Sequence, residues 1–117
     1  MTDTSTHALL NPAAADLGAH APKPTATTPG MTEASLVLWT NGRVETGLWE
    51  SNAGSFVAKR EGYSEICTFV SGEATITAAG EEPITYRAGD MVAMPSGWVG
   101  VWDVPVAVRK HYTTIND

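Results

Sequence analysis

Apolar and polar residues alternate with a period of two along several short stretches of the chain. Residues 74–78 show this alternation, a turn containing Gly80 follows, and Ile84 and Tyr86 continue it. Successive side chains of a β-strand point to opposite faces, so the pattern predicts an antiparallel hairpin with one face toward water. No sustained 3.6-residue period follows residue 30, and we therefore expect no substantial helix there.

Other short apolar stretches are separated by glycine and proline turns, as at residues 88–90 and 95–97. The stretch 65–70 is apolar on both sides, which predicts a strand covered by the barrel wall on one face and by a partner subunit on the other. Many short strands with closely spaced turns are typical of an all-β sandwich or barrel. The remaining strands are expected at residues 36–39, 65–70, 91–94, 98–103 and 106–114.

The first part of the chain has a different composition, rich in alanine, threonine and proline, with few large apolar side chains. Such a segment buries too little surface to offset the entropy lost on ordering. We therefore predict an N-terminal tail over residues 1–35 and a single domain over residues 36–117. The tail has room for a short helical turn near residues 11–17, and it could be pinned across the barrel or onto a second subunit.

The charge balance limits the possible partners. The chain has 13 acidic and 7 basic residues, a formal charge of −6, so it lacks the basic surface expected of a protein that binds nucleic acid or an anionic membrane. No apolar stretch approaches the roughly 20 residues needed to cross a bilayer, and the N-terminus has no secretory pattern. The single cysteine, Cys67, is typical of a reducing compartment. These features predict a soluble, cytoplasmic protein.

The last expected strand carries the most informative polar residues. Its even positions hold Val106, Val108, Lys110 and Tyr112, so the core face includes an amine. Burying an unpaired ammonium costs on the order of several kcal/mol, and we expect Glu65 to supply the partner carboxylate. A Glu–Lys pair beside a tyrosine hydroxyl suits proton transfer in a cavity. The alternative is an open barrel end, where the lysine reaches solvent and the pair is structural.

Histidines are too few in the domain to hold a metal. His7 and His20 lie in the tail, which leaves only His111. Glu61 and Glu65 are a thin set of ligands for a hard divalent ion. The sequence also has no glycine-rich phosphate loop, no serine nucleophile elbow and no zinc-type Cys/His cluster. We therefore predict no bound metal and no other cofactor.

Tryptophans are frequent in the domain and could shape a pocket for a small organic ligand. Trp98 and Trp102 fall on one strand face, and we expect them to line the pocket while Trp49 fills the core; the simpler alternative is core filling throughout. Cys67 lies in an apolar strand, so its thiol is expected to be buried and inert. We place it, together with Glu61, among the residues near the ligand.

Two motifs resemble those of the cupin superfamily. Residues 65–72, EICTFVSG, resemble the second half of the first cupin motif, and residues 89–97, GDMVAMPSG, resemble the second motif. The order of these and further short matches, closing with Arg-Lys-His-Tyr at 109–112, is similar to the single-domain cupins grouped with (S)-ureidoglycine aminohydrolase and the ethanolamine-utilisation cupins. The resemblance covers nearly all of residues 45–115.

This resemblance implies an RmlC-like cupin jelly-roll barrel of two antiparallel sheets, an all-β fold that is usually a homodimer with its site inside the barrel mouth. Metal-binding cupins place two histidines before the motif glutamate and a third five residues after the proline of the second motif. The manganese ion of ureidoglycine aminohydrolase depends on such ligands. In this chain the three histidine positions hold Lys59 and Glu61, or Ala58 and Arg60 if one gap is placed differently, and then Gly100.

Two functional hypotheses follow. In the first, the protein is an amidohydrolase-like or lyase-like enzyme for a small, polar, nitrogen-containing metabolite, with Glu65 and Lys110 as an acid–base pair and Tyr112 as a hydrogen-bond donor. In the second, the same pocket belongs to a non-catalytic module that binds or senses a metabolite. A purely structural dimer with a filled barrel is a third possibility, since one fold hosts many functions.

Overall fold

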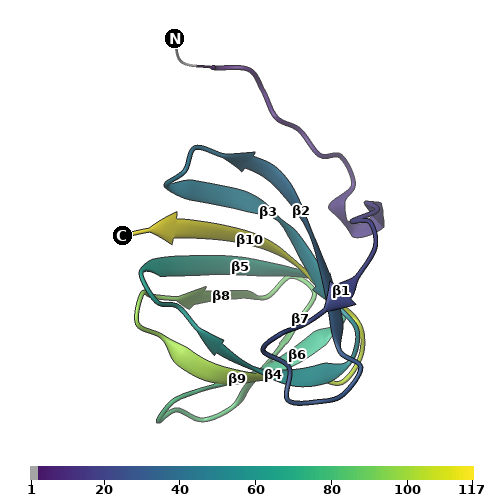
Figure 1. Cartoon of the computed structure of the whole chain (residues 1–117), viewed down its shortest axis with the longest axis vertical. Coiled ribbons are helices and arrows are strands. Elements are labelled where there is room, and N and C mark those ends of the chain that lie inside the picture. The colour runs from purple at the N-terminus through teal and green to yellow at the C-terminus, as the bar shows by residue number, and fades with distance from the viewer. Residues whose placement is uncertain (1–2) are drawn as a thin grey trace.

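Two antiparallel β-sheets pack against each other in a computed structural model that describes residues 3–117 (Figure 1). One sheet has six strands in the order β1-β2-β3-β10-β5-β8, and the other has four in the order β4-β9-β6-β7. The prediction of an all-β barrel of two antiparallel sheets is confirmed. The elements are the 3-10 helix η1 (Pro12–Ala14) and the strands β1 (Ala21–Pro22), β2 (Thr32–Thr40), β3 (Val44–Ser51), β4 (Gly54–Lys59), β5 (Tyr63–Ser71), β6 (Glu73–Ala78), β7 (Ile84–Arg87), β8 (Met91–Met94), β9 (Val99–Val104) and β10 (Val108–Asn116).

The hairpin predicted from the two-residue alternation is present as β6 and β7. Ile76 pairs with Ile84 across it, and Ala74 and Ile76 are buried while their neighbours along β6 are half-exposed. Strand β8 has the predicted bounds. The last strand begins two residues later than expected, because Val106 lies in a bend and is 53% exposed.

The core lies between the two sheets and is built largely from aromatic side chains. Trp102 is fully buried, with its ring centroid 5.3 Å from that of Phe56 and 5.8 Å from that of Phe69. Met94 and Val108 are also deeply buried. Burial of an aromatic side chain contributes about 1.5–3 kcal/mol through the hydrophobic effect, so this cluster holds the sheets together and leaves the site to one end of the barrel.

The N-terminal segment is pinned across the outer face of the six-stranded sheet. Leu17 packs with Ala34 and Leu48, and Val70 of β5 is half-buried against this group. At Val70 the covering layer is therefore the chain's own tail, whereas Ile66, on the same outer face, stays 42% exposed. The expected helical turn is present only as η1.

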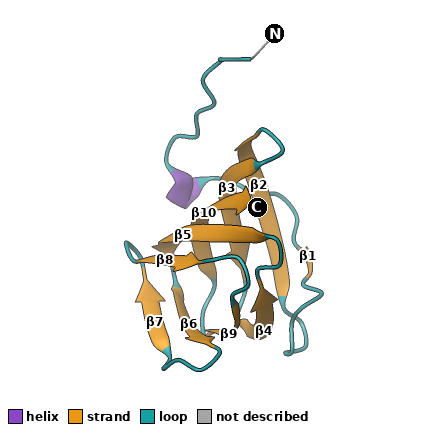
Figure 2. Ribbon diagram, turned by 90° about the vertical axis from the view of Figure 1, so that its left-hand side faces the viewer, coloured by secondary structure: helices purple, strands orange, loops and turns teal. Residues whose placement is uncertain are grey.

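Residues 23–30, which we name the strap, continue this segment along the edge of the other sheet (Figure 2). The amide of Thr27 donates to the carbonyl of Ser55 at 2.8 Å, and Ala26 forms a β-bridge with Phe56. The strap thus lies alongside β4, joined to it by backbone hydrogen bonds, and forms one wall of the barrel mouth. No helix in residues 3–117 is long and apolar enough to cross a membrane.

Candidate functional site

The barrel mouth contains a cavity of about 260 Å³, which we name the central cavity. It lies where the core faces of β3, β5 and β10 meet the end of β4 and the strap. Its walls combine aromatic rings with several cations and one carboxylate. The lining residues used below are Lys23, Trp49, Phe56, Lys59, Arg60, Tyr63, Glu65 and Lys110.

Glu65 and Lys110 form the buried ion pair expected from strand parity. Lys110 Nζ donates to Glu65 Oε2 at 2.6 Å, and both side chains are more than nine-tenths buried. Burial alone would raise the pKa of Glu65, but the positive charges of Lys110 and Arg60 outweigh it and hold that pKa below its usual value. The glutamate is therefore a carboxylate at neutral pH.

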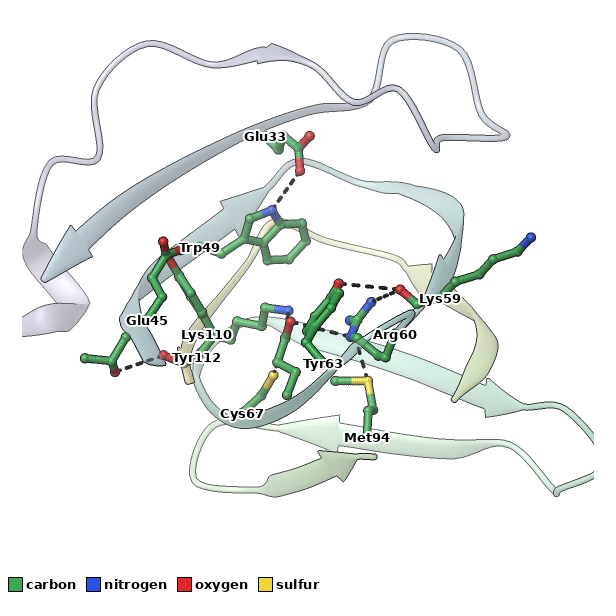
Figure 3. Close-up of polar contacts among 12 residues, drawn as sticks. Glu33, Glu45, Trp49, Lys59, Arg60, Tyr63, Cys67, Met94, Lys110 and Tyr112 are labelled. Carbon is green, nitrogen blue, oxygen red and sulfur yellow. Dashed lines mark hydrogen bonds and ion pairs between the residues drawn. The ribbon is translucent and has the colours of Figure 1, made fainter. Parts of the chain in front are cut away.

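Arg60 is the second cation on this carboxylate, and no role had been predicted for it. Its Nε lies 3.5 Å from Glu65 Oε1, an ion-pair contact without hydrogen-bond alignment. Nη1 donates to the carbonyl of Lys59 at 3.3 Å, and Nη2 makes a weak contact with Met94 Sδ at 3.7 Å (Figure 3). A buried guanidinium with such long contacts retains donor capacity for another acceptor.

The alternation of β4 could have identified this arginine. Phe56 and Ala58 point inward, and Arg60 follows with the same parity at 7% exposure, whereas Lys59 is exposed. The sequence left open which residues occupy the first two histidine positions of metal-binding cupins. The inward direction of Ala58 and Arg60 favours this pair over Lys59 and Glu61. Glu61, predicted to contact ligand, is exposed and does not line the central cavity.

Tyr112 lies near the ion pair but its hydroxyl is directed elsewhere. It donates to Glu45 Oε2 at 2.8 Å, on the side away from Arg60 (Figure 3). Burial, and then this hydrogen bond to Glu45, raise the pKa of Tyr112. The ring lines a smaller neighbouring cavity of about 200 Å³, which also borders Lys110 and Glu65. The predicted donor is thus occupied by an internal carboxylate.

Cys67 is fully buried, as the sequence suggested. Its Sγ donates to Glu65 Oε2 at 2.8 Å, on the oxygen that also accepts from Lys110. Burial, assisted by the negative charge of Glu65, raises the pKa of the thiol to about 12. The thiol stays protonated and acts on the site only through the carboxylate that it contacts.

Trp49 belongs to the core cluster as expected but also lines a cavity wall, whereas Trp102 lies in the core alone. Trp102 lines neither cavity, because β9 directs it into the core, and Lys110 Nζ lies 4.6 Å from its ring centroid. Trp49 pairs with Lys110 across β3 and β10, which places its ring on the wall of both cavities. Its indole Nε1 donates to Glu33 Oε1 at 2.9 Å.

Trp98 does not line the central cavity either. It borders a separate hollow beside β6 and β7, and its ring lies 5.8 Å from the guanidinium carbon of Arg60. A side chain at Gly100 could not be accommodated next to it, since a Cβ there would lie 2.4 Å from the Trp98 ring and 2.7 Å from the Thr77 carbonyl oxygen.

Lys23 reaches the central cavity from the strap. Its Nζ donates to Glu33 Oε1 at 3.0 Å and lies 4.2 Å from the ring centroid of Phe56. This residue was not predicted, because the segment has no periodic pattern and its contacts with the barrel join residues far apart in the sequence.

The family model of the EutQ-like cupin domain matches residues 39–112. The chain belongs to this cupin family. Its fold resembles the EutQ protein of Clostridium difficile, at 22% identity and a TM-score of 0.67 over 78% of this chain and 67% of that one. It also resembles a putative ethanolamine utilization protein Q of Salmonella typhimurium LT2, at 21% identity and a TM-score of 0.67 over 83% and 78% of the two chains.

A protein of unknown function from Pseudomonas syringae is similar as well, at 19% identity and a TM-score of 0.70, over 83% of this chain and 42% of the other. At these identities the likeness concerns the fold alone. No curated protein sequence matches the chain. The relationship to ureidoglycine aminohydrolase stays a prediction.

The site of this cupin does not fit a histidine-bound metal. The inward positions that carry the metal ligands in other cupins hold Ala58, Arg60, Glu65 and Gly100, and Gly100 has no room for a side chain. Arg60 and Lys110 already place two positive charges on the one remaining ligand. Within residues 3–117 no group of three or more His, Cys, Asp or Glu side chains could hold a metal ion.

Proposed function

We propose that this cupin is a binding module for a small organic anion, held in the central cavity. The observation that carries the proposal is the charge balance at its floor, where the buried cations of Lys110 and Arg60 share the single carboxylate of Glu65. One positive charge is therefore left uncompensated in a chain whose formal charge is −6. A buried charge without a full counter-charge is costly, and an anionic ligand would neutralise it.

Arg60 is suited to receive that anion. The guanidinium is planar and can donate two parallel hydrogen bonds to a carboxylate, which adds geometric selectivity to charge attraction. The cavity of about 260 Å³ is at the lower limit of ligand sites in proteins, so it suits a metabolite of few atoms. Trp49 and Phe56 offer apolar walls for the remainder of such a molecule.

Three features favour binding over proton transfer. The cations paired with Glu65 lower its pKa, and burial raises the pKa of Cys67 to about 12. The hydroxyl of Tyr112 is hydrogen bonded to Glu45. A general acid or base works best with a pKa near the working pH, and these groups lie away from it. The amidohydrolase-like or lyase-like hypothesis is therefore less well supported than the binding module.

The proposal can be tested by calorimetric titration with acetate, propionate and butyrate against their uncharged amides. We expect the carboxylates to bind and to raise the melting temperature by mass action, whereas the amides do neither. Arg60→Gln should abolish carboxylate binding, and the exposed Lys59→Gln should retain it. Equal binding of acids and amides, or unchanged binding by a folded Arg60→Gln variant, would contradict the proposal.

A further inference from the structure

The strap brings a third cation to the central cavity from outside the region matched by the family model. That match begins at residue 39, whereas Lys23 lies 16 residues before it. The position of Lys23 is fixed by backbone hydrogen bonds, since its amide donates to the carbonyl of Met31 at 3.0 Å and the amide of Val57 donates to the carbonyl of Thr25 at 3.3 Å. Its side chain is 11% exposed.

The ammonium of Lys23 has unused donors. Of its three N–H groups, one donates to Glu33 among residues 3–117, and Glu33 Oε1 also accepts from the Trp49 indole. The face of Phe56, 4.2 Å from Nζ, stabilises the positive charge but is a weak acceptor. Lys23 can therefore donate to an acceptor in the cavity while it keeps its contact with Glu33.

The cations follow one another along the cavity. Lys23 Nζ and Lys110 Nζ lie 5.3 and 4.8 Å from the ring centroid of Trp49, and Lys110 and Arg60 contact the two different oxygens of Glu65. Lys110 thus connects an outer cation on the strap with an inner one after β4. Free donors lie at both ends of the row, and Lys110 donates to Glu65 between them.

The donors at the two ends of this row support a ligand with two acceptor groups. Apart from Lys59, whose side chain is exposed, three cations line the cavity, and the carboxylates that contact them are those of Glu33 and Glu65. One positive charge remains, and free N–H donors lie at both ends of the row. We propose that Lys23 binds a second anionic group of the ligand, so that the ligand is a short dicarboxylate held by Arg60 at one end and Lys23 at the other. This inference rests on the proposed function, which assigns the first carboxylate to Arg60.

The test compares acids of equal chain length. Dissociation constants are measured by calorimetry at pH 7.5 for malonate, succinate and glutarate against propionate, butyrate and valerate. We expect at least one dicarboxylate to bind about tenfold more tightly than the monocarboxylate of the same chain length. A tenfold difference corresponds to one additional hydrogen bond between charged groups. Lys23→Gln should remove that preference, because it weakens the binding of the dicarboxylates more than that of the monocarboxylates.

Two further variants separate a contact from a structural effect. Lys59→Gln removes the same charge from an exposed side chain that points away from the site, and it should keep the preference (Figure 3). Lys23→Arg keeps the charge on the strap and should also keep the preference for the dicarboxylate. Loss of the preference in this variant would overturn the contact between Lys23 and the ligand. Equal binding of mono- and dicarboxylates, still dependent on Arg60, would overturn the dicarboxylate and leave the anion site standing. Absence of any carboxylate binding would overturn both.

Discussion

Glu65 is the residue on which the buried charges of the site converge. Its Oε2 accepts from Lys110 and Cys67, and its Oε1 faces Arg60. This pairing could be predicted in part, because the parity of β10 places Lys110 in the core and a buried amine needs a carboxylate. The gap in the motif left open whether residue 60 or its neighbours face inward, although the alternation of Phe56 and Ala58 along β4 favours Arg60.

The first prediction concerns the pH dependence of stability. The folded-state pKa of Glu65 lies below the value of about 4.3 expected in the unfolded chain, so its contribution is present above pH 4.3 and is lost as the pH falls through the folded pKa. Wild type should therefore exceed Glu65→Gln in free energy of unfolding at pH 7, and the difference should shrink as the pH falls below 4.3 and through the folded-state pKa.

Urea unfolding of both proteins between pH 3 and pH 7 measures this difference. The carboxylates of Glu33 and Glu50, whose pKa values are also lowered, are present in both proteins and cancel in the comparison. A difference that stays constant over the whole range would show that Glu65 does not titrate with folding.

At the scale of the elements, a strand could be predicted from the sequence when one of its faces is buried and the other is exposed to water. The β6–β7 hairpin has one wet face, and its alternation gave the correct assignment. Strand β3 was not predicted individually, because Leu48 is buried under the tail while Trp49 is buried on the other face. The parity of β9 was correct, yet parity alone could not distinguish the core position of Trp102 from a cavity wall.

The turn between β5 and β6 gives the second prediction. Gly72 has φ +79°, and a Cβ there would lie 2.1 Å from the carbonyl oxygen of Ala107. Gly80 has nearly the same φ, +78°, with nothing within 4 Å. Gly80→Ala should cost about 1–2 kcal/mol of unfolding free energy from its backbone conformation alone. Gly72→Ala should cost about 1–3 kcal/mol more, through the clash.

Chemical denaturation of the two variants isolates that clash, since each is the other's control for the positive φ. Equal losses of stability would mean that the chain near Ala107 moves aside without cost.

At the scale of the whole molecule, the N-terminal segment is bound to the barrel along much of its length. Arg109 donates to the carbonyl of Pro12 at 2.7 Å, His20 contacts Glu50 at 2.7 Å, and Leu17 is 8% exposed. Composition alone predicted a tail, because each of these contacts joins residues more than 15 positions apart and leaves no local pattern in the sequence.

The third prediction tests this attachment. Leu17→Ala should lower the free energy of unfolding by about 2 kcal/mol. This is the lower end of the range for a buried leucine, because Leu17 lies at the edge of the structure. Leu10→Ala is the matched control, since Leu10 is 87% exposed and should change stability by less than about 0.5 kcal/mol. Thermal melting of both variants measures the difference, and equal melting temperatures would contradict the packing.

The strap also covers part of an exposed sheet edge. Strand β4 is at the edge of its sheet, and an uncovered edge presents free amides and carbonyls to which another chain can add. Residues 25–27 occupy part of that edge through their bonds to Ser55 and Val57. A proteolytic cut that releases the strap would therefore remove Lys23 from the cavity and, at the same time, expose an edge prone to aggregation.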